Sequence, residues 1–307
     1  MMPINEETRM TKPNREQFQS NQSAFVEKVI KEYVATSPGN QFRAFNSEPF
    51  FDEPLIGFAD GDDAIFQDYK RAVADFHLTP REALVRHLRD KGINSDPESI
   101  SIISFIMPVS LQTRLSMRRE TVLPSLKWNH TRWHGQDFIY NLSRYLVSVL
   151  EELGYQAIAP EVASFYTTKE LPNGLASNWS QRHIAYAAGL GTFSLNDGFI
   201  TAKGIAMRCG SVVTDAIFPP SPRQYRNHLD NCLFYRDGSC QRCIERCPAN
   251  AITEQGHDKK KCREFLFNRQ KEILKELGRE EGYIGRYLGC GLCQTKVPCE
   301  AGIPPSL

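Results

Sequence analysis

Cysteine is the residue type that most constrains this chain. Eight of its nine cysteines fall in the last quarter of the 307 residues, between Cys232 and Cys299, and none precedes Cys209. The N-terminal sequence MMPINEETRM is acidic where an export signal would be basic and then apolar, so we expect a cytoplasmic protein with reduced thiols. An odd number of crowded thiols in such a protein is typical of metal ligands and not of a disulfide framework.

The first cysteine group has the spacing C-x2-C-x3-C-P, and its members are Cys240, Cys243, Cys247 and Pro248. Bacterial ferredoxins use C-x2-C-x2-C-x3-C-P, in which the fourth cysteine binds a second cluster. The chain therefore matches the last three cysteines of that motif. The position of the first one is held by Asp237, and the nearest thiol before it is Cys232.

The second cysteine group completes a set of eight ligands, the number that two [4Fe–4S] clusters require. We expect one cluster to bind Cys240, Cys243, Cys299 and either Cys232 or Asp237. We expect the other to bind Cys247, Cys262, Cys290 and Cys293. Cys232 is the favoured alternative because a thiolate is a softer iron ligand than a carboxylate. A four-thiolate zinc site or a thioredoxin-type pair would leave several cysteines unexplained. Cys209 is expected to be a core residue.

Charge and apolar content argue against two classes of protein. The 37 basic and 36 acidic residues give a formal charge of +1, which is unlike a protein dedicated to wrapping nucleic acid. The longest apolar stretches are too short or too interrupted to span a bilayer, so no membrane partner is expected. A hydrophobic content of 41% is enough for a sizeable core.

The remaining sequence alternates between helical and extended patterns, which predicts an α/β or α+β fold. Helices are expected over 15–33, from Pro80 onward, over 137–153 and over 178–188. Strands are expected over 101–107, 155–159, 199–201 and 205–218, the last two paired through a turn, and 49–63 is expected to be a loop. Three prolines within Pro219–Pro222 predict a boundary between an α/β catalytic domain, 1–221, and an iron–sulfur domain, 222–307.

The size of the N-terminal part bears on function. A pair of neighbouring clusters transfers single electrons and needs only a small fraction of this chain. The residues before the proline boundary must therefore supply an electron acceptor, a substrate pocket or a docking surface. This favours an oxidoreductase over a simple electron carrier, although an electron-transfer or accessory protein that binds no further cofactor remains the alternative.

Several segments resemble one protein family in order and spacing. They are Ala187–Phe193, Gly198–Thr201, Gly210–Asp215, Gly238–Cys243 and Cys247–Ile252. Over about Asn178 to Cys299 the chain resembles the epoxyqueuosine reductases, which are related to the reductive dehalogenases. The resemblance implies a nitroreductase-like α/β domain that holds a cobalamin and a bicluster ferredoxin-like domain that reduces it. Family members remove an epoxide oxygen from a queuosine precursor in tRNA and their relatives remove halide from organohalides, so the substrate, a small molecule or tRNA, stays open.

The resemblance also implies which residues border the corrin ring. They are Gly189, Gly191, Asn196, Thr201, Gly210 and Ser211. Glycine suits this role because a main chain without Cβ can approach a flat macrocycle closely, although Gly189 is equally suited to end a helix. The chain departs from the family at Leu175, which stands where the catalytic aspartate is expected.

Proton donors must therefore come from other residues. If 178–188 is helical, His183 and Tyr186 are candidates to donate a proton, and Arg182 to bind an anionic group. The alternative is that His183 and Tyr186 are structural residues.

Partners are suggested by two basic runs. Lys259–Lys261, just before Cys262, could dock an acidic ferredoxin or flavodoxin that donates electrons. The segment from Arg114 to His134 mixes basic and aromatic residues, which suits either nucleic acid or a solvated surface. A flavin in place of cobalamin has no motif of its own in the sequence.

Overall fold

The computed structural model describes residues 15–305 except residue 44. Its centre is a sheet of four antiparallel strands, in the order β1 (Leu55–Asp60), β2 (Ser101–Pro108), β8 (Met207–Thr214) and β3 (Ala157–Ile158). The strand β2 lies in the middle and is buried along its whole length. The mixed helix-and-strand architecture confirms the expected fold class.

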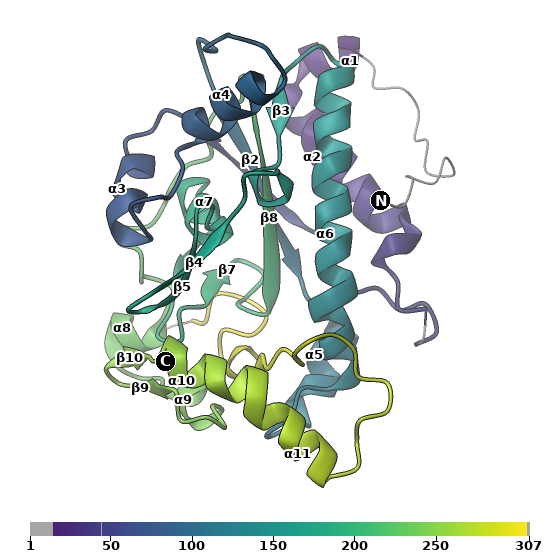
Figure 1. The fold of residues 1–307 in the computed structure, drawn as a ribbon, viewed down its shortest axis with the longest axis vertical. Helices are drawn as coiled ribbons and strands as arrows, with labels where there is room; N and C mark the ends of the chain where they lie inside the picture. Colours follow the sequence, from purple (N-terminus) through teal and green to yellow (C-terminus); the bar gives the residue numbers. More distant parts are fainter. Residues whose placement is uncertain (1–14, 44, 306–307) are drawn as a thin grey trace.

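Side chains alternate between the two faces of this sheet and belong to two separate cores. On one face Ile103 and Val212 pack with the 27-residue helix α6 (Leu126–Glu152) and with α2 (Gln22–Thr36). On the other face Ile102 and Val213 pack with α4 (Pro80–Asp90), α7 (Gln181–Ala187) and α3 (Ile65–Ala72). The result is three layers, with α6 running the height of the molecule beside the sheet (Figure 1).

Helix boundaries follow local capping. Thr79 and Glu82 form a reciprocal capping box at the start of α4, with Pro80 in its first turn, as the sequence predicts. The predicted helix over 15–33 is two helices, α1 (Arg15–Ser20) and α2, because Asn21 caps the second one by accepting from the Ala24 N–H.

The helix α6 begins eleven residues earlier than the sequence predicts. The Ser125 hydroxyl accepts from the Trp128 N–H and sets the start. The first turns carry tryptophans and histidines that interrupt the apolar periodicity, and they include Gly135, where a Cβ would meet the Phe51 ring. Tertiary packing thus decides this boundary.

Two predictions about strands are wrong. The segment 49–63 is not only a loop, because it contains β1, whose Gly57 lies so close to the Ala188 carbonyl that a Cβ would clash. The strand β7 (Phe199–Thr201) pairs with β6 (Gly191–Phe193) and not with the strand that follows it, which joins the central sheet as β8. The strands β1 and β8 both pair with β2, which is distant from each of them in sequence.

The cysteine-rich part packs under one end of the sheet (bottom in Figure 1). Its short elements are α8 (Leu233–Asp237), α9 (Arg242–Glu245), β9 (Ile252–Thr253), β10 (Gly256–His257), α10 (Lys259–Glu264) and α11 (Gln270–Glu276). A π-helical turn, Phe265–Arg269, joins α10 to α11, and a 3-10 turn, Leu292–Gln294, follows. None of the described helices is both long and apolar enough to cross a bilayer.

The first turns of α6 hold the end of the cysteine-rich part in place. The Asn129 amide donates to the carbonyls of Ile284 and Leu288, at 3.1 and 3.0 Å, and accepts from the Ile284 N–H. The Trp133 indole donates to the Tyr287 carbonyl at 3.0 Å. Side chains that precede the proline segment therefore satisfy backbone groups that follow it.

The proline segment itself is anchored to the sheet. The Ser221 N–H donates to the Phe58 carbonyl, and the Ser221 hydroxyl accepts from the Phe58 N–H, at 2.9 Å each. The domain boundary at 221/222 stays a prediction, and the chain there follows β1 closely.

Candidate functional site

Four cysteines surround a small apolar pocket below β7. They are Cys232, Cys240, Cys243 and Cys299, and we call them the first quartet. Their thiols interact electrostatically: burial, together with repulsion from the neighbouring Cys232 and Cys240 thiolates, raises the pKa of Cys243 to about 12. A set of four crowded, buried thiols fits a cationic centre between them.

The structure separates Cys232 from Asp237, the two candidates for the fourth ligand. Cys232 is buried at the start of α8 and lines the pocket. The Asp237 side chain is exposed at the end of α8, where its carboxylate accepts from the N–H and the hydroxyl of Ser239. Cys232 therefore lies with the other three thiols, whereas Asp237 closes a turn.

The other four cysteines form a second quartet, which consists of Cys247, Cys262, Cys290 and Cys293. Burial raises the pKa of Cys293 well above its usual value, and Cys290 and Cys262 contribute to the shift. Cys243 of the first quartet acts on Cys293 as well, so the two quartets are neighbours. Among the described residues no three His, Cys, Asp or Glu side chains converge on a single metal ion.

The second quartet opens into a cavity of about 500 Å³, within the range of small-molecule sites. Its lining also includes residues of the α/β part, which are Trp128 and Arg132 of α6, Arg182 of α7 and Arg208 of β8. We call this space the large pocket. The second quartet therefore lines the large pocket, whereas the first quartet lines the separate, smaller pocket.

Asn196 is the predicted cofactor residue that lies on the large pocket. Its side-chain amide donates to the Cys293 carbonyl at 2.8 Å, and its carbonyl oxygen accepts from the Gly198 N–H at 2.9 Å. Asn196 also lines the first quartet's pocket. It therefore lies between the two thiol sets.

The other five predicted cofactor residues contact protein groups. A Cβ at Gly189 would meet the Pro222 carbonyl, and one at Gly210 would meet Phe105 in the core. Gly191 pairs with Thr201 between β6 and β7, and the Thr201 hydroxyl donates to the Gly204 carbonyl at 2.9 Å. The buried Ser211 hydroxyl accepts from the Trp179 indole and donates to Gln181. Each of these residues thus has a packing role in the structure.

The three predicted catalytic residues occupy different places. Arg182 lines the large pocket and donates to the Asp197 carbonyl. The His183 ring bonds the Ser180 hydroxyl at 2.8 Å and packs against Tyr69 and Phe193, and burial lowers its pKa to about 3. A neutral, packed imidazole favours the structural interpretation of His183. Tyr186, half-buried, also packs against Phe193.

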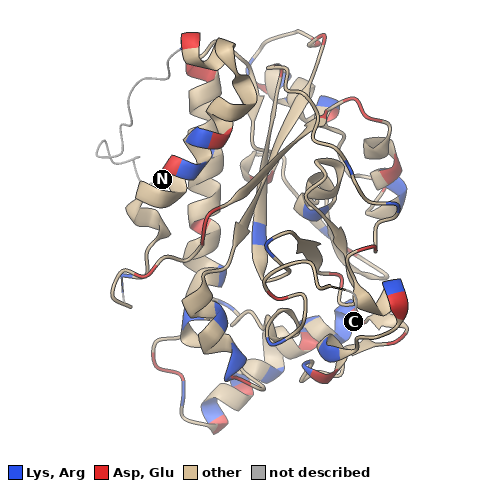
Figure 2. Cartoon of the chain, turned by 180° about the vertical axis from the view of Figure 1, so that it is seen from behind, with Lys and Arg blue, Asp and Glu red and all other residues tan. Residues whose placement is uncertain are grey.

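Sequence patterns did not single out two charged residues of the α/β part, Arg208 and Glu161. Arg208 looked like one residue of an apolar strand, and it is the charged residue of β8; Figure 2 shows how few charges the central strands carry. Leu175, at the position expected for the family's aspartate, lies on the hairpin β4 (Thr168–Leu171) and β5 (Gly174–Ser177) and lines the pocket. Glu161 follows β3, accepts from Gln181 at 2.9 Å, and has its pKa raised by burial. The feature that marks Glu161 as unusual is the burial of its carboxyl group close to β3, which is visible in the fold and not in the sequence.

Comparison with known proteins agrees with this geometry. Residues 237–300 match the family model of the 4Fe-4S double cluster binding domain. The chain is 31% identical over 222 residues to epoxyqueuosine reductase of Bacillus anthracis, which covers 68% of this chain and 50% of that protein. It is 32% identical over 171 residues to epoxyqueuosine reductase of Bacillus cereus, covering 55% and 38%. The chain thus spans about half the length of the curated relatives it matches.

Solved structures give a weaker likeness. A crystal structure of epoxyqueuosine reductase with an epoxyqueuosine-modified tRNA-Tyr stem loop has a TM-score of 0.44 at 16% identity, covering 95% of this chain and 68% of that one. A catabolic reductive dehalogenase has a TM-score of 0.47 at 12% identity, covering 94% and 38%.

Together, the double-cluster match and the two quartets define an iron–sulfur protein with a C-terminal domain that binds two [4Fe–4S] clusters. Within that class, the chain is a divergent relative of the epoxyqueuosine reductases.

Proposed function

We propose that this protein is a cytoplasmic reductase that uses two [4Fe–4S] clusters and a cobalamin bound in the large pocket. The observation that carries the proposal is the second quartet in the wall of a 500 Å³ cavity whose lining also includes residues of the α/β part. Iron–sulfur clusters supply single electrons, and a reduced corrinoid supplies the chemistry for removing an oxygen or a halide. The similarity to epoxyqueuosine reductases supports the corrinoid.

The residues that would hold these groups follow from the geometry. The first quartet would ligate one cluster, with Cys232 as its fourth ligand, and the second quartet the other. Asn196 fixes the Cys293 main chain between them. On the pocket side, Arg182 would bind an amide or anionic group, while Trp128 and Leu175 would exclude water. Gly189, Gly191, Thr201, Gly210 and Ser211 would shape the surrounding backbone.

Proton delivery is assigned to Glu161 in preference to His183 and Tyr186. A carboxyl group whose pKa is raised keeps its proton closer to neutral pH, whereas an imidazole with a pKa of about 3 holds none. The Gln181 amide fixes one oxygen of Glu161 and leaves the other available.

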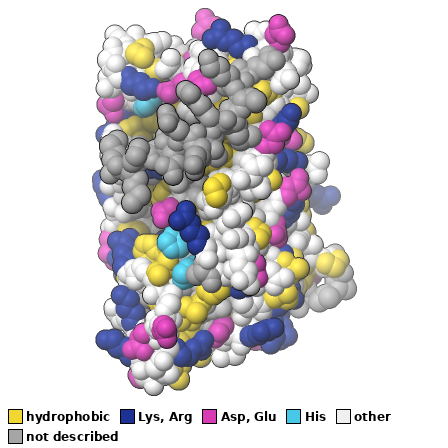
Figure 3. Space-filling model, turned by 90° about the vertical axis from the view of Figure 1, so that its right-hand side faces the viewer, with side chains coloured by type: hydrophobic (Ala, Val, Ile, Leu, Met, Phe, Trp, Pro, Cys, Tyr) yellow, Lys and Arg dark blue, Asp and Glu magenta, His cyan; other side chains and the backbone are white. Residues whose placement is uncertain are grey.

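The electron donor would dock at α10, beside Cys262. Lys260 and Lys261 are exposed there, and Lys259 lies 3.6 Å from Asp197. Such a surface suits an acidic ferredoxin or flavodoxin. Elsewhere charges of both signs intermingle, as on the face shown in Figure 3.

The alternative is an electron-transfer protein without a corrinoid, and Leu175 in place of an acid is the observation that favours it. Anaerobic reconstitution with iron, sulfide and cobalamin distinguishes the two. We expect about eight irons and stoichiometric cobalt per chain, with corrinoid bands over the broad iron–sulfur absorption. Eight irons without cobalt would support the carrier, and zinc or far less iron would refute both.

A further inference from the structure

The large pocket carries more positive than negative charge. Its lining contains four cationic residues, which are Arg132, Arg182, Arg208 and Lys259, and one acid, Asp197. Asp197 is already engaged, at 3.2 Å from the His257 ring and 3.6 Å from the Lys259 ammonium. The three arginines are therefore left to act on whatever the pocket binds.

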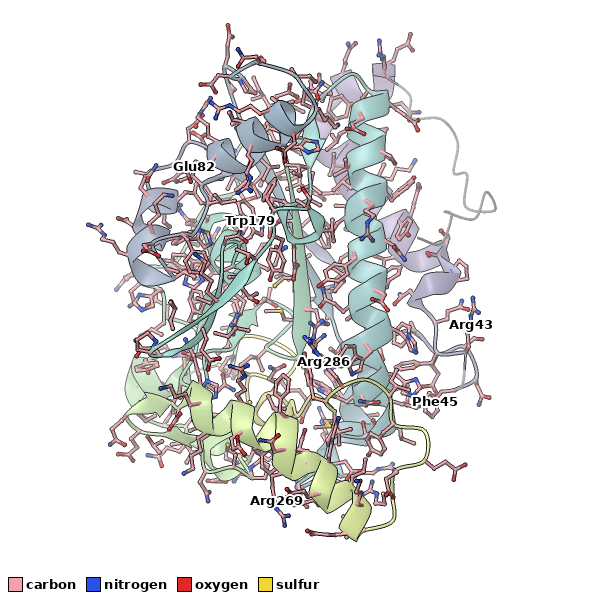
Figure 4. All side chains as sticks on the ribbon, in the orientation of Figure 1. Arg43, Phe45, Glu82, Trp179, Arg269 and Arg286 are labelled. Atoms are coloured by element: carbon pink, nitrogen blue, oxygen red, sulfur yellow. The ribbon has the colours of Figure 1, made fainter. Side chains whose placement is uncertain are left out.

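The hydrogen bonds of these arginines go to neutral acceptors. Arg208 donates from Nε and from a terminal nitrogen to the Gln136 side-chain oxygen, the first at 2.7 Å. Arg132 donates to the Tyr287 hydroxyl and lies over the Tyr287 ring, 5.0 Å from its centroid. The exposed Arg286, which is labelled in Figure 4, lies over the same ring. Among the described residues neither Arg132 nor Arg208 forms a salt bridge, so their charges are not neutralised by direct contact.

The charge of Arg208 is destabilised by its surroundings. Burial lowers the pKa of Arg208 to about 10, and Arg132 contributes to the lowering. Glu161 opposes this shift, but burial raises the pKa of Glu161 and weakens it as a counter-charge. Two guanidinium groups held together in a partly desolvated site favour an anion between them.

The second quartet has an arginine of its own. Burial raises the pKa of Cys290, and Arg246 opposes that rise; Arg246 is held in place by donating to the carbonyls of Thr295 and Glu120. Arg132 and Arg208 come from the α/β part, on α6 and β8, and Arg132 packs on Gly289 beside Cys290.

We propose that Arg132 and Arg208 form a subsite that binds the carboxylate or phosphate group of the substrate, a small organic anion. The inference rests on the proposed function and specifies its substrate class. Trp128, Leu175 and Phe265 supply apolar surface in the same pocket for the body of such a molecule.

The first test uses cluster-loaded, corrinoid-free protein, with inorganic phosphate and benzoate as probes at constant ionic strength. We expect both anions to bind the wild type saturably in calorimetry. Arg208→Gln should weaken their binding about tenfold or more because a charge-assisted contact is lost, whereas Arg208→Lys should retain binding. The matched control is Arg269→Gln, at an exposed arginine paired with Glu272 and Glu276. Absence of binding to the wild type, or equal binding to folded, iron-replete Arg208→Gln, would overturn the proposal.

The second test separates a substrate anion from the phosphodiester of cobalamin by comparing cobalamin with cobinamide, which lacks that group. A substrate subsite predicts that Arg208→Gln leaves the affinity for both corrinoids unchanged, and that phosphate still binds after cobalamin. Selective loss of cobalamin affinity, with phosphate excluded by bound cobalamin, would assign the pair to the cofactor and overturn the substrate assignment. If neither corrinoid binds while phosphate does, the subsite stands and the proposed cofactor fails.

Discussion

The two cysteine quartets have the same chemistry but different surroundings. The first quartet is packed among apolar side chains, including Ile205, Leu233 and Val297, around a small pocket. The second quartet borders the large pocket, whose wall is rich in cations. Because potentials of iron–sulfur clusters depend on burial and nearby charge, we expect the two clusters to differ in reduction potential.

Replacing a cluster ligand should have the largest effect, because it removes one cluster and leaves the other in place. Cys290→Ser should lower the iron content by about half, since one four-iron cluster is lost, and should leave the first cluster's signal in electron paramagnetic resonance. Cys232→Ala should remove the first cluster instead. Cys209→Ala is the control, because that thiol belongs to neither quartet and should leave about eight irons; full iron content in Cys232→Ala would refute its assignment as ligand.

An ion pair with a buried carboxylate should affect the first quartet selectively. Glu300, next to Cys299, is 3% exposed and accepts from Arg118 through both oxygens at 2.8–3.0 Å. Glu300→Gln leaves Arg118 without its partner and should lower the free energy of unfolding by about 2 kcal/mol. Chemical denaturation measures this cost, and the first cluster's spectrum should change more than the second's.

The control for that variant is Glu53→Gln, at an exposed carboxylate paired with Lys31 and Lys203. Surface pairs contribute little, so its stability should stay close to that of the wild type. Equal effects of the two variants would contradict the role given to Glu300.

Asn196 should affect both quartets at once. Asn196→Ala removes the bonds to the Cys293 carbonyl and the Gly198 N–H and should cost about 1–2 kcal/mol because buried groups are left unpaired. Redox titration should show both clusters shifted, whereas Asn268→Ala, at an exposed side chain on the π-helical turn, should shift neither. A shift of one cluster alone would place Asn196 with that quartet only.

The buried His183 on α7 should make the stability of the protein depend on pH. The pKa of His183 is about 3 in the folded state against 6.5 for the ordinary value. A lowered histidine pKa means that the unfolded chain binds the proton more readily, so stability falls as the pH drops from about 6.5 toward 3. His183→Gln should flatten this slope in melting temperature against pH, whereas His134→Gln, at an exposed ring, should not; an unchanged slope in His183→Gln would contradict the lowered pKa.

Local sequence patterns predicted what local chemistry determines. The grouping of thiols, the start of α4 at Pro80 and the strand β2 depend on spacing within a few residues or on composition. The large pocket does not, because Arg132 and Arg208 are 76 positions apart in the chain and meet only when α6 packs on β8. The strand β1 was missed for a related reason: its proline- and glycine-rich surroundings resemble a loop, and its pairing with β2 is long-range.

The grip of Asn129 and Trp133 on 284–288 has a consequence for how this molecule can be divided. A fragment that began at the proline segment would lack the donors and acceptors that those carbonyls and amides use. Its iron–sulfur clusters would keep their cysteine ligands, but the backbone at residues 284–288 would lose its hydrogen-bond partners. Fusing the cysteine-rich part to another enzyme would therefore require that the first turns of α6 be included.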